Sequence, residues 1–65
     1  MKETTKTNKE IFDEKYPYKE LAQKPMICVE AIGYLKALIE YFPSEQNWAD
    51  SYMINLMAIV LFHSL

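Results

Sequence analysis

The sequence has one cysteine and one histidine, and this scarcity removes two common ways of stabilising a short chain. Cys28 has no second cysteine with which to form an internal disulfide, and together with His63 it is too small a set for a structural zinc site. A chain of 65 residues buries only about 60% of the surface that its unfolded form exposes. We therefore expect no metal and no cofactor, and we expect oligomerisation to supply the missing burial.

Arginine is absent, because all seven basic residues are lysines, and the formal net charge is −2. Recognition of phosphates and base edges favours the bidentate guanidinium group and a basic surface. Six of the lysines are concentrated near the N-terminus, at positions 2, 6, 9, 15, 19 and 24. We expect no nucleic-acid partner, and an RNA-binding hairpin dimer that uses these lysines is kept as an alternative.

Long apolar runs are also absent. The longest extends over seven residues, from Leu56 to Phe62, whereas a membrane-spanning helix needs about 20. The first residues are charged and do not resemble a signal peptide. We expect a cytoplasmic protein with no membrane partner. A membrane-interface helical peptide is a second alternative, although the segment 45–63 has no lysine for its polar face.

The residues that are present divide the chain into helical segments. Residues 1–6 are polar and lack periodicity, which predicts a disordered tail before a single helical domain, 7–65. The motif Thr7-Asn8-Lys9-Glu10 fits a capping box and predicts a helix to about Lys15. Pro17 opens a second short segment, Tyr18 to Lys24.

Two longer helices follow, over 26–42 and 45–63. In the first, Cys28, Ile32, Leu35, Ile39 and Phe42 are spaced 4, 3, 4 and 3, which predicts an apolar seam. Pro43 ends this helix, and Ser44 is the predicted N-cap of the next. So short a link favours an antiparallel hairpin. Gly33 indicates either a close helix crossing or a loosely packed position.

After Asn55 the second helix is apolar on all sides, and one neighbouring helix cannot cover it. The residues that cover it could come from the two short N-terminal segments, which we call the front helices, from a second copy or from another protein. The predicted fold is all-α: an antiparallel two-helix hairpin with one or two short N-terminal helices, assembling into a helical-bundle dimer. Its predicted oligomer core consists of Leu56, Ile59, Val60 and Phe62.

Aromatic residues indicate an interaction surface. Tyr34 and Tyr41 are seven residues apart, Trp48 and Tyr52 four apart, so each pair lies along one side of its helix. Large rings with a polar tip are typical of protein interfaces. These four residues are the predicted partner-binding residues. The alternative is that the rings anchor the front segment around Tyr16-Pro17-Tyr18 on the hairpin.

Candidates for catalysis are few. Cys28 and His63 could lie close together in a hairpin, but no motif supplies an oxyanion site. The favoured interpretation is a core cysteine and a histidine that complements the helix dipole at the C-terminal end. Three front acids, Glu10, Asp13 and Glu14, lack calcium-loop spacing and are interpreted as a solvated face. The predicted function is a small non-catalytic protein–protein interaction module: an inhibitor, adaptor or regulatory subunit with an unknown partner and a tendency to self-associate.

Overall fold

The computed structural model describes residues 5–65. Of the predicted disordered tail, residues 1–4 lie outside the described residues, and Thr5 and Lys6 have no regular secondary structure. The described chain contains four α-helices and one 3-10 turn, without a strand among residues 5–65. The all-α prediction is therefore confirmed.

The two front helices begin where the sequence predicts. Helix α1 is Asn8–Lys15, and its capping box is complete. The backbone N–H of Glu10 donates to Thr7 Oγ1 at 3.1 Å, and the backbone N–H of Thr7 donates to Glu10 Oε1 at 3.0 Å. Helix α2 is Tyr18–Gln23, preceded by Pro17 in an extended conformation. Both helices thus start at positions that local chemistry specifies.

The longer helices are α3, Pro25–Tyr41, and α4, Gln46–Ser64. A 3-10 turn, η1, Pro43–Glu45, joins them. The prediction that Ser44 caps α4 is wrong, because Ser44 lies inside this turn and the N-cap position falls on Glu45. The Glu45 carboxylate accepts a hydrogen bond from the Trp48 indole N–H and makes no capping bond to the backbone of α4.

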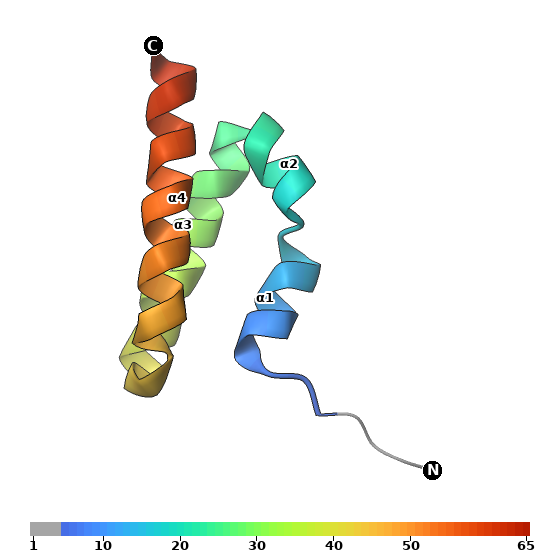
Figure 1. The fold of residues 1–65 in the computed structure, drawn as a ribbon, viewed down its shortest axis with the longest axis vertical. Coiled ribbons are helices and arrows are strands. Elements are labelled where there is room, and N and C mark those ends of the chain that lie inside the picture. Colours follow the sequence, from blue (N-terminus) through green and yellow to red (C-terminus); the bar gives the residue numbers. More distant parts are fainter. Residues whose placement is uncertain (1–4) are drawn as a thin grey trace.

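Helices α3 and α4 lie side by side, with α1 and α2 at one side of the pair (Figure 1). Helix α2 contacts both long helices. The C-terminal end of α4 extends beyond the other helices (Figure 1). The shared core takes one or more residues from each α-helix: Phe12, Leu21, Cys28, Ala31, Leu35, Leu38, Ala49 and Leu56.

The buried face of α3 differs from the predicted seam. Cys28 and Leu35 are buried as predicted, but Phe42 is half exposed, and Ala31 and Leu38 are buried in addition. Predicted seam positions Ile32 and Ile39 are only partly buried. The reason is that α4 is not the only element on α3: helix α2 also contacts it, and Phe12 of α1 packs against Tyr34.

Gly33 occupies an open position on α3. A Cβ atom added to it would meet no atom within 4 Å. The loosely packed interpretation is therefore correct within the single chain, and a close helix crossing at this residue is not.

None of the helices in residues 5–65 combines the length and the hydrophobicity that crossing a bilayer requires.

Candidate functional site

Phe12 is the centre of an aromatic cluster that joins three helices. Its side chain is 1% exposed. Its ring centroid lies 5.1 Å from that of Tyr16, 5.8 Å from Tyr34, 6.2 Å from Trp48 and 5.4 Å from Tyr52. These separations and the tilted ring planes are those of attractive aromatic pairs. The cluster therefore fastens α1 to α3 and α4.

Three of the four predicted partner-binding residues belong to this cluster. Tyr34, Trp48 and Tyr52 are partly buried against it, and each lies close to Phe12. The fourth, Tyr41, is 78% exposed. The structure thus brings three of the rings together around Phe12 of α1, and Tyr41 lies outside this cluster. A role for any of the four in binding a partner stays a prediction.

The residues of the predicted oligomer core also differ in their surroundings. Leu56 is already buried by its own chain, and Ile59 and Val60 are partly buried. Phe62 is 74% exposed, although it lines a hollow together with Tyr18 and Ala22 of α2. The front helices therefore cover the start of the apolar run and not its end. Burial of these residues by a second copy stays a prediction.

A hollow between the long helices is lined entirely by apolar side chains. We name it the α3/α4 groove; its residues are Val29, Ile32, Met57, Val60 and Leu61. Met57 is 47% exposed and Leu61 is 66% exposed. No residue of α1 or α2 lines it. The described chain therefore has an apolar groove that its own front helices leave open.

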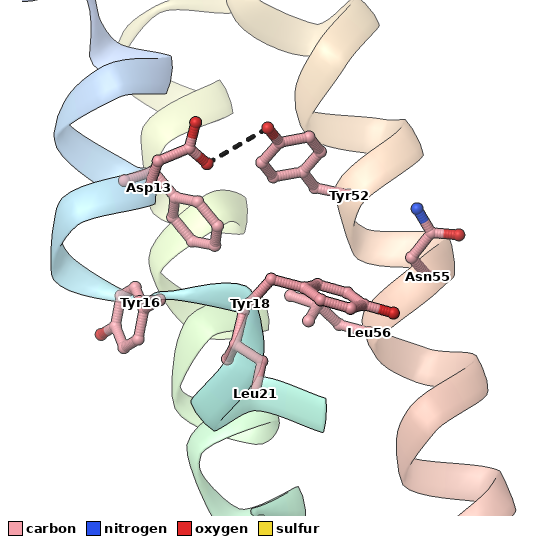
Figure 2. Close-up of a pocket in the computed structure, with 8 residues that line it drawn as sticks. Asp13, Tyr16, Tyr18, Leu21, Tyr52, Asn55 and Leu56 are labelled. Atoms are coloured by element: carbon pink, nitrogen blue, oxygen red, sulfur yellow. Dashed lines mark hydrogen bonds between the residues drawn. The ribbon is translucent and has the colours of Figure 1, made fainter. Parts of the chain in front are cut away.

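A second hollow lies between α1, α2 and α4, and we name it the Asp13 cavity. Its volume is about 170 Å³. Figure 2 shows Asp13 and Tyr52 pointing toward each other from α1 and α4, with Tyr18 and Leu21 below them in the view. The lining combines four rings, two leucines and two polar groups: Phe12, Tyr16, Tyr18, Tyr52, Leu21, Leu56, Asp13 and Asn55.

Polar contacts at this cavity affect its tyrosines. The Tyr52 hydroxyl donates a hydrogen bond to Asp13 Oδ1 at 3.2 Å. Burial raises the pKa of Tyr52, and the neighbouring Asp13 carboxylate raises it further because it favours the protonated phenol. The pKa of Tyr16 is raised by burial and by the nearby Glu30 and Tyr34 side chains. Both phenols are therefore held in the neutral form.

Cys28 and His63 both make polar contacts with α2. The Cys28 thiol, which is fully buried, donates to the Leu21 carbonyl at 3.0 Å, and burial raises the pKa of the thiol. The Nε2 atom of His63 lies 3.0 Å from the Ala22 carbonyl. A raised pKa disfavours the thiolate that a nucleophile needs. The two side chains thus contact consecutive carbonyls of α2 and do not bond to each other.

The three front acids have separate contacts. Glu10 belongs to the capping box, Asp13 accepts from Tyr52, and Glu14 forms an ion pair with Lys6. In the part of the chain that the structure describes, no three ligand-type side chains converge on a common point. The acids therefore serve α1 and its attachment to α4 individually.

Sequence reasoning missed the central place of Phe12 and the open groove. The signal for Phe12 was its position directly after the capping box, and the pattern did not show which partner it would find. The groove had a clearer signal. Met57, Val60 and Leu61 are spaced 3 and 4 from the methionine, and Val29 and Ile32 are spaced 3, so each set shares one side of its helix.

The chain was compared with protein-family models, curated proteins and solved structures. No match was found in any of the three comparisons. The groove and the cavity are therefore the features that bear on its function.

Proposed function

We propose that this protein is a small non-catalytic protein–protein interaction module whose docking surface is the α3/α4 groove, and that the groove binds a second copy of the same chain. The observation that supports this most directly is the groove itself. Five apolar side chains line it without one polar residue, and the front helices of the chain do not contribute to it.

Exposed apolar surface of this kind favours association. Single exposed hydrophobic residues are ordinary, but adjacent ones on two packed helices form a continuous patch. Met57 and Leu61 are among the large exposed residues of α4, and Val29 faces them from α3. Removing such a patch from water contributes about 25 cal/mol for each Å² of apolar area.

A second copy fits this surface because the groove lies along two helices. In our proposal α3 and α4 form an antiparallel hairpin, and two hairpins related by a two-fold axis pack into a four-helix core. A two-fold interface brings the same patch of each copy together, so the apolar side chains of one copy would meet those of the other. Val60 lines the groove, and we propose that it belongs to the oligomer core, whereas Leu56 is buried within its own chain.

Other features agree with binding rather than catalysis or RNA recognition. Cys28 is inaccessible and its pKa is raised, which is unfavourable for a nucleophile. Three of the six lysines near the N-terminus make contacts within the chain: Lys6 pairs with Glu14, while Lys9 and Lys15 lie near tyrosine rings. These contacts reduce the charge that the front segment offers to phosphates.

The test is the molar mass in solution, measured by light scattering over a concentration series, for the wild type and for Met57→Glu. Because Met57 is half exposed in the single chain, the glutamate fits the monomer, but a dimer would bury its charge. We expect the dimer dissociation constant to rise at least about tenfold, which corresponds to roughly 1.4 kcal/mol.

The matched control is Met26→Glu, the same substitution at a more exposed methionine that does not line the groove. It should leave the dissociation constant unchanged. A wild-type protein that is monomeric at every concentration would contradict the second copy as the occupant. If that monomer bound phosphatidylcholine vesicles and Met57→Glu abolished the binding, the groove would be assigned to a lipid surface instead.

A further inference from the structure

The Asp13 cavity shares no lining residue with the α3/α4 groove, so it can be considered by itself. Its interior is built from buried side chains: Phe12, Leu21 and Leu56 are each at most 3% exposed. Asp13, Tyr52 and Asn55 add polar groups from α1 and α4, and the rings of Tyr16 and Tyr18 complete the lining (Figure 2). An apolar interior with a few polar groups is the usual form of a small-molecule site.

The charge of the cavity selects the ligand class. Asp13 is the one charged residue in its lining. The Tyr52 hydroxyl occupies Oδ1, and among residues 5–65 no basic side chain forms an ion pair with this carboxylate. Burying an anion next to Asp13 would be unfavourable, whereas a cation would gain an attractive partner. The ligand should therefore be positively charged.

Four aromatic rings favour the same class. Phe12, Tyr16, Tyr18 and Tyr52 line the cavity, and the face of an aromatic ring attracts ammonium groups. The chain already shows this attraction beside the cavity, because Lys9 Nζ lies 5.7 Å from the Tyr52 ring centroid and Lys15 Nζ lies 5.7 Å from that of Tyr16. Neither lysine lines the cavity, so its interior lacks a cation of its own.

The volume limits the size of the ligand. A cavity of about 150 Å³ accommodates benzene, and this one measures about 170 Å³. A short alkyl chain with one ammonium group fits, and a nucleotide does not.

We propose that the Asp13 cavity binds an alkylammonium cation, with the ammonium group near the Asp13 carboxylate and the alkyl part against Phe12, Leu21 and Leu56. The cation is either a free primary amine or the side chain of a lysine on a partner protein. Both present the same chemistry, which is a short apolar chain that ends in a positive charge.

The experiment is an NMR titration of the full chain with n-butylammonium chloride at constant ionic strength, following the backbone amides of Asp13, Leu21 and Asn55. The comparison ligand is 1-butanol, which has the same carbon skeleton without the charge. We expect a saturable shift with a dissociation constant on the order of 1–10 mM. The alcohol should bind about tenfold more weakly.

Three variants test whether the Asp13 carboxylate is the charge that attracts n-butylammonium. Asp13→Asn retains the size of the side chain and an acceptor for Tyr52, and it should weaken n-butylammonium binding about tenfold. Glu40→Gln removes one negative charge from an exposed position of α3 outside the cavity and should leave the titration unchanged. Lys9→Gln removes a competing cation beside Tyr52 and should tighten binding about twofold.

A second titration distinguishes the two sources of the cation. Nα-acetyl-lysine N-methylamide carries the backbone that a partner's lysine would bring. Tighter binding than n-butylammonium would assign the cavity to a protein lysine, and weaker binding would assign it to a free amine.

Three results would overturn the proposal: equal affinity for 1-butanol, wild-type affinity in Asp13→Asn, or no saturable shift. Light scattering on the same samples keeps this outcome separate from self-association. A monomeric protein that still binds n-butylammonium would refute the dimer alone, and a dimer without cation binding would refute only the cation site.

Discussion

The hydroxyl of Tyr52 donates a hydrogen bond to Asp13 at 3.2 Å, across 39 positions of the sequence. This contact joins α4 to α1 at the rim of the Asp13 cavity (Figure 2). Directly behind it, the Tyr52 ring packs against Phe12 with centroids 5.4 Å apart. One side chain therefore both fastens the front helix and shapes the candidate site.

Replacing Tyr52 with phenylalanine separates these two roles. The ring and its packing on Phe12 remain, while the hydrogen bond to Asp13 is lost. Because this hydrogen bond is exposed to solvent, we expect a loss of only about 0.5 kcal/mol in the free energy of unfolding. Urea denaturation measures it. In the Asp13→Asn background the same substitution should cost a different amount, and strict additivity of the two would show that the residues do not interact.

Replacing Phe12 with alanine should have a far larger effect, about 3–5 kcal/mol, because it removes the buried centre of the aromatic cluster. For a chain of this size such a loss approaches the whole stability. The measurement is thermal unfolding followed by circular dichroism. The control is Tyr41→Ala, at an exposed ring, which should change the stability by no more than about 0.5 kcal/mol. Equal effects of the two substitutions would contradict the described packing.

Replacing Gly33 with alanine should stabilise the protein by about 0.5–1 kcal/mol. The glycine lies within α3, where alanine has the higher helix propensity, and the added methyl group meets no neighbour within 4 Å. Urea denaturation should be done at a concentration where the protein is monomeric, so that contacts between copies do not enter. A destabilised monomer would show that Gly33 is packed against another segment.

Stability should fall at alkaline pH. The pKa of Cys28 is raised above 9.0, and those of Tyr16 and Tyr52 are raised above 10.0, so the folded state keeps these protons to higher pH than the unfolded state does. The contribution is complete below the unfolded pKa values and is lost as the pH rises through the folded ones. Urea midpoints should therefore be constant near neutral pH and decrease from about pH 9 upward.

Two variants test which side chains cause the decrease in stability at alkaline pH. Cys28→Ala should remove the part that begins nearest pH 9, and Tyr16→Phe with Tyr52→Phe should make the part above pH 10 shallower. Stability that rose with pH in this range would contradict the raised pKa values.

The sequence allowed the helices to be placed to within about one or two residues, apart from the cap at Ser44. The signals were local: a capping box at Thr7, and prolines at positions 17, 25 and 43. Each acts on the backbone within a turn of its own position, so its effect does not depend on the rest of the fold.

The candidate site was less predictable. The spacing of the aromatic residues identified Tyr34, Trp48 and Tyr52 as notable, but it could not show that Phe12 would lie among them. Periodicity identifies an apolar face and does not identify what covers it. The predicted seam on α3 failed at Phe42 for this reason.

The sequence by itself determined that the chain is helical and where its helices begin and end, because those features follow from backbone geometry and short-range hydrogen bonds. Only the tertiary structure decided which faces are covered. Phe12 of α1 packs against Tyr34 of α3, helices α2 and α4 contact α3 as well, and the α3/α4 groove is left open. Which faces are buried depends on packing between residues far apart in the sequence. The local sequence pattern of one helix does not specify this packing.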